Sequence, residues 1–391
     1  MRPRLLLFDL YTGGHHRAYL EMLARAWVTG DREGRLEIAA PQALFDAHPD
    51  FLRWIQAQDP AKLSFLPVSL PEPLREGDIS LRDVLRNDLA HGRALREVLA
   101  SSLPEETLLM YFDHCQASLA LRRIRGASVS GIYFRPSFHY PNTSRATGFR
   151  KRSLLSAALT NRCLKRVLTL DPFAVDALSD QRFAWLPDGL DTARFGQSPA
   201  QVRDAWGVGA DSKVLLFFGV VSARKGIHEL LAALASVRTP VTLVIVGRIP
   251  DAERPLVEAS IQAARASGGA IVLDDRYVRA EEIQDFFHAA DVATVAYRHH
   301  VGSSNVLIRA AAAGVPVVGP TFGLMGRLIT EHHLGAAVDP ADTEALAEAI
   351  DRMLAGMLGE PTGFDPESAA WFAQANSEHT FAETVFREVL K

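Results

Sequence analysis

Residues 301–318 read VGSSNVLIRAAAAGVPVV and carry most of the information about the fold. The pattern predicts a polar turn, a short apolar helix, a Gly-Val-Pro break and a buried strand. Ser303, Ser304 and Asn305 would cap the helix, and free backbone N–H groups at its start would attract an anion such as a diphosphate. The plainer alternative is an ordinary N-cap, which every helix needs in some form.

Short apolar runs that predict strands alternate with amphipathic runs that predict helices along the whole chain. The predicted strands are 5–10, 36–40, 108–112, 129–134, 166–170, 214–220, 241–247, 270–273, 292–297 and 315–318. The predicted helices include 18–27, 81–99, 228–236, 252–266, 280–289 and 343–355. Continuously apolar strands between helices predict parallel sheets covered on both faces. Two such series predict an α/β protein with two doubly wound, Rossmann-like domains.

A turn at 187–191 marks the expected boundary between the two domains. We expect a first domain over 1–190, a second over 191–365, and a final helix over 366–391 that packs back on the first domain. That final segment carries Trp371, Phe372, Phe381 and Phe386 at roughly helical spacing. Two doubly wound domains that face each other would form a central cleft, and the loops after the strands would line it.

Composition excludes several classes of protein. The 391 residues are 48% hydrophobic and 23% charged, as expected for two globular domains, and the net charge of −4 does not favour nucleic-acid binding. Two cysteines are too few for a disulfide framework, which favours a cytoplasmic protein. The start of the sequence does not resemble a signal peptide, and no apolar run is long enough to span a bilayer.

Two glycine-containing loops follow predicted strands. Gly13 and Gly14 precede a helix and would let the backbone approach a ligand closely, although a tight structural turn explains them equally well. Arg224 and Lys225 follow strand 214–220 and suit a phosphate ligand, because arginine binds two oxygens and lysine supplies a compact charge. An exposed basic turn is the alternative, but the strand–loop–helix context favours a ligand site.

Histidines follow two neighbouring strands of the first domain. His114 follows strand 108–112, and Arg135 and His139 follow strand 129–134. A histidine at a cleft can bond a substrate hydroxyl or carry a proton, whereas a lone histidine is more often structural. We therefore take His114, Arg135 and His139 as candidate catalytic residues. No His/Cys cluster has metal-site spacing, and no Walker-type phosphate loop is present.

The stretch 143–170 carries seven basic residues and no acidic one. Its apolar positions would give the segment an amphipathic character, and 145–166 could contact an anionic membrane surface peripherally, at the inner face of the membrane. The common alternative is a solvated helix face beside a core face.

Several motifs together resemble the retaining glycosyltransferases of GT-B architecture, family 4. The segment LPDGLDTARF at 186–195 is similar to the linker that enters the second domain of that family. The strand and loop from 215 to 226, the strand 241–247, the run 289–297 and the run AAGVPVV at 312–318 follow in the family's order and spacing. Gly13 and Gly14 match its first glycine loop. Residues 42–105 match nothing in the family pattern.

The resemblance implies a nucleoside-diphosphate sugar as donor, held mainly by the second domain. Lys225 would contact the diphosphate, with the amides of Ser304, Asn305 and Val306 behind it. Arg276 and Val278 lie where such enzymes hold the base. Basic residues and a helix start would neutralise the leaving diphosphate, so no metal and no cofactor are expected.

The sequence departs from the family pattern at residues that normally contact the donor. Two glutamates usually stand eight positions apart before the Gly-Val-Pro, and these positions are Val301 and Arg309 here. Arg309 cannot accept a hydrogen bond from a ribose hydroxyl, and it could reach a phosphate instead. The family's arginine after the phosphate-binding strand is Val220, and its histidine after the fifth strand falls at Arg135.

The leading hypothesis is a glycosyltransferase that acts with retention on an unknown acceptor: a glycan, a lipid-linked glycan or a small molecule. The missing glutamates motivate an alternative, a catalytically silent GT-B partner or nucleotide-binding subunit. A third hypothesis is another GT-B activity, such as an epimerase or a phosphorylase.

Overall fold

The computed structural model divides the chain into two compact units, and each is described by itself. Unit 1 comprises Met1–Gly189 and Glu378–Lys391, and unit 2 comprises Leu190–Ser377. The structure describes residues 4–12, 16–69, 81–121, 124–140, 144–192, 196–298, 300, 302–356 and 363–391. Every structural statement below refers to these residues.

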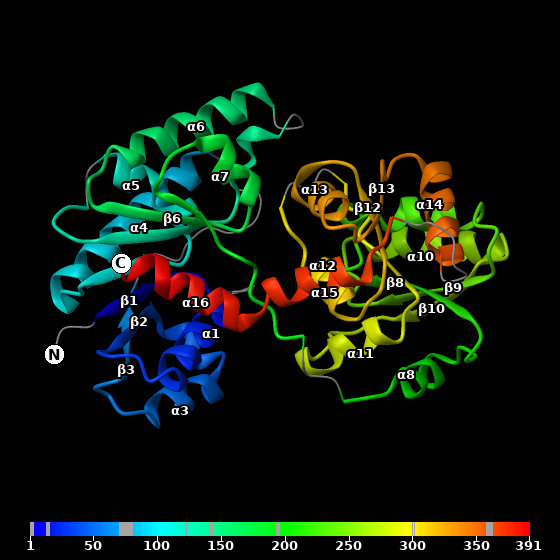
Figure 1. Cartoon of the computed structure of the whole chain (residues 1–391), viewed down its shortest axis with the longest axis horizontal. Helices are drawn as coiled ribbons and strands as arrows, with labels where there is room; N and C mark the ends of the chain where they lie inside the picture. Colours follow the sequence, from blue (N-terminus) through cyan, green and yellow to red (C-terminus); the bar gives the residue numbers. More distant parts are fainter. Residues whose placement is uncertain are drawn as a thin grey trace. The chain divides into compact units, whose positions relative to one another are not determined.

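Unit 1 is built on a fully parallel sheet with the strand order β3-β2-β1-β4-β5-β6-β7 (Figure 1). The strands are β1 (Leu5–Phe8), β2 (Leu36–Pro41), β3 (Leu63–Val68), β4 (Glu106–Leu109), β5 (Val129–Tyr133), β6 (Leu164–Thr169) and β7 (Phe183–Trp185). The strand order reverses between β1 and β4. In such sheets ligands bind beyond the carboxyl ends of the strands at this point.

Helices join the strands of unit 1 and cover both faces of its sheet. They are α1 (His16–Thr29), α2 (Gln42–Asp46), α3 (Pro49–Gln56), α4 (Leu81–Ser102), α5 (Gln116–Ala120), α6 (Arg145–Leu159), α7 (Pro172–Leu178) and α16 (Glu378–Val389). Two 3₁₀ turns, η1 (Phe112–His114) and η2 (Ser137–His139), follow β4 and β5. Both turns therefore lie at the carboxyl edge of the sheet.

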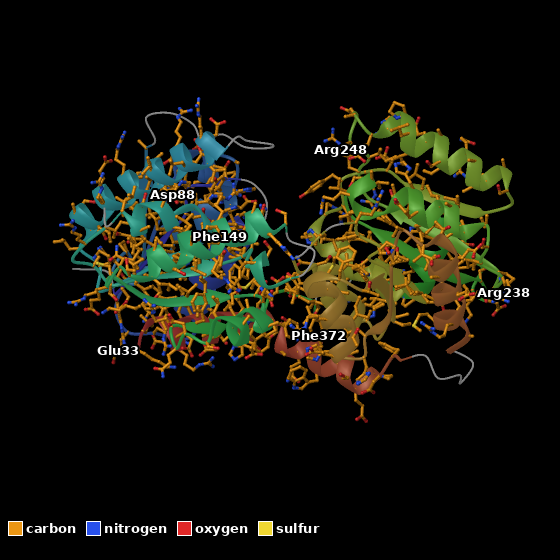
Figure 2. All side chains as sticks on the ribbon, turned by 90° about the horizontal axis from the view of Figure 1, so that it is seen from above. Glu33, Asp88, Phe149, Arg238, Arg248 and Phe372 are labelled. Atoms are coloured by element: carbon orange, nitrogen blue, oxygen red, sulfur yellow. The ribbon has the colours of Figure 1, made fainter. Side chains whose placement is uncertain are left out.

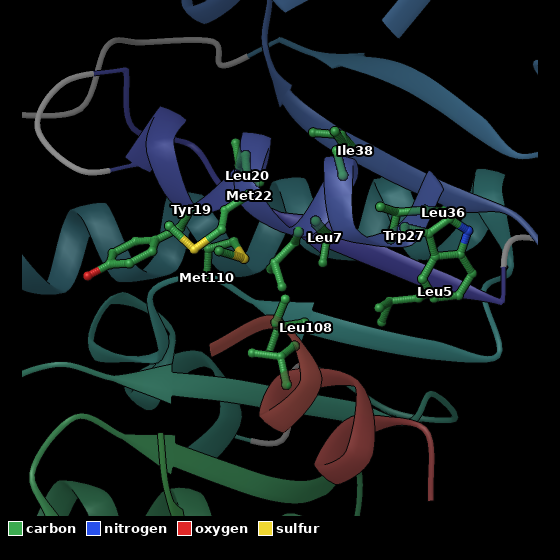
Figure 3. Packing of buried hydrophobic residues seen from close by; sticks show 14 of the residues in the cluster. Leu5, Leu7, Tyr19, Leu20, Met22, Trp27, Leu36, Ile38, Leu108 and Met110 are labelled. Carbon is green, nitrogen blue, oxygen red and sulfur yellow. The ribbon is translucent and has the colours of Figure 1, made fainter. Parts of the chain in front are cut away.

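Alternate residues of β1 enter two different hydrophobic cores. Leu5 and Leu7 belong to the core that contains α1 and α16, where Trp27 is fully buried (Figure 3). Leu6 and Phe8 belong to the core on the other face, with α4 and α6. The period of two follows from the pleat of a strand, and burial on both faces explains why the strand is continuously apolar.

Unit 2 repeats the same architecture with the strand order β10-β9-β8-β11-β12-β13, again fully parallel (Figure 1). The strands are β8 (Lys213–Phe218), β9 (Val241–Val246), β10 (Ala270–Asp274), β11 (Val292–Thr294), β12 (Val317–Pro320) and β13 (Gly335–Val338). The helices are α8 (Pro199–Trp206), α9 (Ile227–Leu234), α10 (Arg254–Ala266), α11 (Ile283–His288), α12 (Asn305–Ala312), α13 (Gly323–Glu331), α14 (Thr343–Gly356) and α15 (Pro366–Ala375), with 3₁₀ turns η3 (Ala223–Lys225) and η4 (Ala280–Glu282). The switch point lies between β8 and β11.

The C-terminal segment differs from the single helix expected over 366–391. It forms two helices, and α15 belongs to unit 2, where it packs against α12. Figure 2 labels Phe372 on this helix. Only α16 belongs to unit 1, where Phe381 and Phe386 are buried in the core beside α1.

The predicted α/β class with two Rossmann-like domains is confirmed, and the structure adds three strands that the sequence pattern did not indicate. These are β3, β7 and β13, which lie at sheet edges. Within the part of the chain that the structure describes, no helix is long and apolar enough to cross a membrane.

Candidate functional site

The loop between β8 and α9 depends on two glycines. Gly219 has a φ of 105°, and a Cβ there would lie 2.3 Å from Lys225 Nζ. Gly226 has a φ of 75°, and its Cβ would lie 1.9 Å from the carbonyl oxygen of Ala296. A side chain at Gly226 would therefore force apart the loop and the chain that follows β11, whereas one at Gly219 would displace the end of Lys225. Gly226 thus lets the loop lie directly against that chain.

Lys225, Tyr297 and Ser304 form a connected group that we call the anion site. Lys225 Nζ donates to the carbonyl oxygen of Phe218 at 3.3 Å and lies 5.1 Å from the centroid of the Tyr297 ring. The Tyr297 hydroxyl lies 3.1 Å from Ser304 Oγ. Ser304 caps α12, where its Oγ accepts from the backbone N–H of Val306 at 3.3 Å. Two segments that are distant in sequence, the loop after β8 and the stretch from Tyr297 to the start of α12, thus meet at the switch point of unit 2.

His300 connects Arg224 to the start of α12. Its Nε2 lies 3.2 Å from the carbonyl oxygen of Ser303, and because a carbonyl only accepts, Nε2 carries the proton. In that tautomer Nδ1 accepts from Arg224 Nη1 at 3.5 Å. The structure therefore brings the predicted donor-binding residues Arg224, Lys225, Ser303, Ser304, Asn305 and Val306 together at the N-terminus of α12. Two cations beside a helix start can bind an anion with more than one phosphate oxygen.

Arg276 and Val278 follow β10, at the same edge of the unit 2 sheet. Arg276 donates to Asp274 Oδ1 at 2.9 Å and to Glu282 Oε2 at 3.2 Å, so its guanidinium is held by two carboxylates. Val278 is half-buried, and Tyr277 is 83% exposed. This segment therefore offers its backbone and these two side chains to a ligand. A contact with a base remains a prediction.

Arg309 is buried and faces α11. Its Nη1 donates to Gln284 Oε1 at 3.3 Å, and Gln284 Nε2 donates to the carbonyl oxygen of Arg309 at 3.1 Å. Burial lowers the pKa of Arg309 to about 10, and the nearby charge of Asp191 acts in the opposite direction. The structure thus engages Arg309 in a contact inside unit 2, and the predicted contact with a donor phosphate stays a prediction.

Unit 1 carries a cluster of aromatic rings and imidazoles beyond β1 and β4, which we call the His–Tyr cluster: Tyr11, His16, His91, Tyr111 and His114. His16 Nδ1 lies 2.7 Å from Asp9 Oδ2, and the His16 ring stacks on Tyr111 with 4.1 Å between centroids. His114 lies 4.7 Å from Tyr11 and 5.5 Å from His91 by the same measure. The cluster stands at the switch point of the unit 1 sheet, where doubly wound domains bind ligands.

Two histidines of this cluster are neutral at pH 7. Burial lowers the pKa of His91 and of His114 to about 4 in each case. His91 Nδ1 lies 2.8 Å from the carbonyl oxygen of Asn87, which fixes the proton on that nitrogen. Among the described residues its Nε2 has no hydrogen-bond partner. His114 can therefore accept or donate a hydrogen bond, but it carries almost no acidic proton at neutral pH.

The other predicted catalytic residues lie in the loop after β5. Arg135 is exposed, and its backbone N–H donates to Asp113 Oδ1 at 3.2 Å. The side chain of His139 is only 7% exposed, and its Nε2 lies 3.1 Å from Asp171 Oδ2 without the geometry of a hydrogen bond. Asp171 itself caps α7 and accepts from the Tyr140 hydroxyl at 2.9 Å. His139 is therefore packed into the fold, and a direct part in catalysis stays a prediction.

Three residues of the sequence-based prediction lie outside the described residues: Gly13, Gly14 and Val301. Within the described part of the chain, no group of three or more His, Cys, Asp or Glu residues could hold a metal ion.

Residues 212–356 match the family model described as "Glycosyl transferases group 1". This range contains β8 to β13 and the whole anion site. This part of the chain is therefore similar to the group 1 glycosyl transferases.

The relatives of this part of the chain include enzymes whose names give different acceptors. The chain is 31% identical over 184 residues to a GDP-mannose-dependent alpha-(1-6)-phosphatidylinositol monomannoside mannosyltransferase from Mycolicibacterium smegmatis. That match covers 44% of this chain and 46% of the relative, so less than half of the relative's length is matched. The resemblance to group 1 glycosyltransferases that the sequence motifs indicate is confirmed for residues 212–356.

Two solved structures resemble the fold over nearly its full length. Sucrose-phosphate synthase from Thermosynechococcus elongatus gives a TM-score of 0.74 at 20% identity, covering 99% of this chain and 98% of that structure. Anabaena HepE in complex with UDP and glucose gives a TM-score of 0.66 at 17% identity, covering 98% of each chain. At these identities the likeness concerns the fold alone, and the fold is GT-B.

Sequence reasoning missed several residues around both candidate sites. Tyr297 was assigned only to a strand, although it joins Lys225 to Ser304. Asp9, His16 and His91 were not selected, because they lie on a strand end and on two helices rather than in one motif. The one available signal was position: Asp9 and Tyr297 each follow a strand at a switch point.

Proposed function

We propose that this protein transfers a sugar from a nucleoside-diphosphate sugar to the hydroxyl group of an acceptor. The meeting of Lys225, Tyr297 and Ser304 at the start of α12 carries this proposal. An anion bound there would contact a lysine, with Arg224 and the helix N-terminus nearby. The match of residues 212–356 to group 1 glycosyl transferases supports the same reaction class.

The anion site would act on the leaving group. The bond between the anomeric carbon and the diphosphate oxygen breaks, and a bond from that carbon to the acceptor oxygen forms. Negative charge grows on the departing diphosphate, where Arg224, Lys225 and the amides of α12 stabilise it. This arrangement supports a reaction that needs no metal, and the resemblance to retaining enzymes supports retention of configuration.

Unit 1 would supply the acceptor side. His114 is a neutral imidazole at pH 7 and can accept a hydrogen bond from an acceptor hydroxyl, which loses its proton in the reaction. Arg135 follows β5, the strand next to the one that precedes His114. It is exposed and could hold an anionic group. The acceptor is a glycan, a lipid-linked glycan or a small molecule. Two free cysteines support a cytoplasmic location.

Nucleoside-diphosphate binding tests the proposal. Titration calorimetry with GDP and UDP should give saturable binding to the intact chain, and Lys225→Ala should weaken it roughly tenfold to a hundredfold, because one charge-assisted contact is lost. The matched control is Arg238→Ala, which removes a cation at the amino edge of the same sheet, where the side chain is 82% exposed. Equal affinities for the Lys225→Ala variant and the unaltered protein would refute the anion site.

The choice between GDP and UDP defines the donor. The mannosyltransferase relative uses GDP-mannose by its name, and HepE was solved with UDP. Whichever nucleotide binds more tightly should be the one whose sugars are hydrolysed or transferred. The reaction should continue in the presence of a chelator, since Arg224 and Lys225 take the place of a metal ion.

A catalytically silent GT-B subunit is the second candidate. The replacement of a carboxylate by Arg309, and its engagement with Gln284 inside unit 2, favours it. Incubation with a panel of nucleotide sugars distinguishes the two functions. Nucleotide release from at least one sugar supports the transferase, whereas tight nucleotide binding without any release supports the silent subunit.

A further inference from the structure

The N-terminal half of α6 exposes an aromatic ring among cations. We call Arg145, Phe149, Arg150 and Arg152 the α6 patch. Phe149 is 76% exposed, which is unusual for a large apolar side chain, and all three arginines are exposed. Figure 2 labels Phe149 on this helix of unit 1. The patch is therefore an accessible surface that the fold of unit 1 does not use.

Helical spacing places the patch on the outer side of α6. Residues 145, 149 and 152 are four and three positions apart and lie on one face, and Arg150 is exposed on the side next to Phe149. Leu155 and Ala158 are buried on a different side of the helix, and α6 packs against α5. Burial of that side holds the patch toward the outside.

The cations of the patch have no carboxylate partners among the described residues. No acidic residue occurs between 144 and 170, and the first turn of α6 contains none. Arg152 lies 5.5 Å from the Phe138 ring, a contact that leaves its charge uncompensated. Arginine in the first turn also interacts unfavourably with the helix dipole. Unpaired arginines at a helix start are unfavourable and bring no visible gain in stability here. Such residues are expected where they serve a function other than folding.

Lys151 ties this half of the helix to the loop after β5. Unlike its neighbours it is half-buried, and its Nζ donates to the carbonyl oxygen of Arg135 at 3.0 Å and to Ser137 Oγ at 2.8 Å. The α6 patch thus begins at the carboxyl edge of the unit 1 sheet, the edge that carries His114 and Arg135. A surface that covers the patch would lie beside the proposed acceptor loops.

We propose that the α6 patch docks unit 1 onto a bilayer surface that contains anionic lipid. Arginines would contact lipid phosphates at the headgroup level, and Phe149 would enter the boundary between headgroups and acyl chains. Each cation near an anionic surface contributes attraction that falls within a Debye length. Phe149 adds an apolar contact that salt does not screen. The inference does not depend on the donor site, because it concerns a separate surface.

Vesicle co-sedimentation tests the surface. The intact chain should sediment with phosphatidylcholine vesicles that contain phosphatidylglycerol, and much less with phosphatidylcholine alone. The double variant Arg145→Glu, Arg152→Glu should lose more than about tenfold in apparent affinity, since two attractions on the same face become repulsions. Phe149→Ser should weaken binding as well, and its residual binding should be more sensitive to salt.

The matched control makes the same change of charge outside the patch. Arg162 and Lys165 are exposed, belong to the same basic stretch, and lie beyond the other end of α6. Arg162→Glu, Lys165→Glu should keep most of the vesicle binding, and Lys225→Ala should keep all of it. Equal losses in the two charge-reversal variants, or equal sedimentation with both lipid mixtures, overturn the proposal. Unchanged melting temperatures exclude misfolding, and binding of the intact chain to RNA but not to vesicles would also refute a membrane surface.

Discussion

Tyr297 is the residue that unites the two halves of the anion site. Its ring lies 5.1 Å from Lys225 Nζ, and its hydroxyl lies 3.1 Å from Ser304 Oγ. The side chain is 4% exposed, so both contacts occur away from bulk water. A buried ring beneath a cation and a hydroxyl at a helix cap are two separable interactions. Tyr297 is therefore a positioning residue for the groups that would meet the diphosphate.

Conservative substitutions separate these two contacts. Tyr297→Phe keeps the ring under Lys225 and removes the hydroxyl, so nucleoside-diphosphate affinity should fall only about threefold to tenfold. Tyr297→Leu removes both contacts and should cost more. In a calorimetric double-mutant cycle, Tyr297→Phe and Ser304→Ala should be less than additive, because they remove the same bond. Full additivity would mean that the hydroxyl and the cap act independently.

Arg309 should contribute mainly to stability. Arg309→Met removes the donor to Gln284 Oε1 and leaves that buried oxygen unpaired, at an expected cost of about 1–3 kcal/mol in the free energy of unfolding. Urea unfolding measures this cost, and calorimetry with the preferred nucleotide measures affinity on the same variant. A loss of affinity larger than the loss of stability would instead support the predicted contact with a phosphate.

The roles of individual residues could be predicted only where the residues of a site follow one another in one loop. Ser303 to Val306 and the Arg224–Lys225 pair each follow a strand, so the strand–loop–helix pattern was sufficient to find them. The geometry around Tyr297 needed the pairing of β8 with β11, which local sequence does not encode. The orientation of the Arg309 side chain depends on its contact with Gln284, which lies on a different helix. Partners on other elements are the part that sequence reasoning could not supply.

At the scale of elements, α16 is part of the unit 1 core although it ends the chain. Phe381 stacks on Tyr19 with 5.0 Å between ring centroids, and Phe386 meets Trp27 edge-on at 5.5 Å. The guanidinium of Arg32 lies 4.3 Å from the Phe386 ring. Four aromatic rings from the two ends of the sequence thus close one side of the core. Helical spacing of the aromatic residues predicted the packing but not the break between α15 and α16.

Loss of one α16 ring should destabilise unit 1 selectively. Phe386→Ala removes a side chain that is 2% exposed, and we expect a cost of about 3–5 kcal/mol. Hydrogen exchange should accelerate in β1, α1 and α16, while unit 2 keeps its protection and its nucleotide affinity. Trp371→Ala on α15 is the control, because that side chain is 54% exposed and should cost little. Uniform acceleration in both units would show that the two unfold together.

The strands that sequence analysis missed share a physical reason. β3 contains Pro67, β7 has three residues, and β13 reads GAAV. All three lie at sheet edges, where one side of the strand is unpaired and less apolar surface is buried. Central strands need continuous apolar runs and were therefore visible. These three strands are specified by the sheet that they join more than by their own composition, whereas the edge strand β10 keeps an apolar run and was predicted.

At the scale of the whole molecule, the two units share one architecture but carry different charges at the switch points of their sheets. Unit 2 places two cations and a helix start there, which suits a diphosphate. Unit 1 places neutral imidazoles, tyrosines and Asp9 there, which suits uncharged hydroxyl groups. A chain built from two similar domains can thus divide donor and acceptor binding between them. The unit 1 arrangement also has a consequence for stability in acid.

Three buried groups with large pKa shifts contribute to the pH dependence of unit 1. Burial lowers the pKa of His91 and His114 to about 4, below the usual 6.5, so the unfolded chain binds their protons first as the pH falls. Their contribution to stability is complete above pH 6.5 and is lost between 6.5 and 4, by at most about 1.4 kcal/mol per pH unit for each histidine. Burial raises the pKa of Asp88 to about 6, so its protonation opposes this loss between 6 and 3.8.

Unit 1 should therefore lose stability from pH 7.5 to pH 5, with the steepest loss at about pH 5.5 to 6, where the two histidines of the unfolded chain are mostly protonated and Asp88 opposes the loss only in part. Urea unfolding at half-unit pH intervals, followed by hydrogen exchange in β1 and α4, measures the trend. The double variant His91→Gln, His114→Gln has no such imidazoles, so its stability should change less over this range and should rise slightly below pH 6 as Asp88 gains a proton. His48→Gln is the control, because burial lowers the pKa of His48 as well, but that histidine is only half-buried and lies outside the His–Tyr cluster. A double variant with the same pH dependence as the unaltered protein would show that the acid sensitivity comes from other groups.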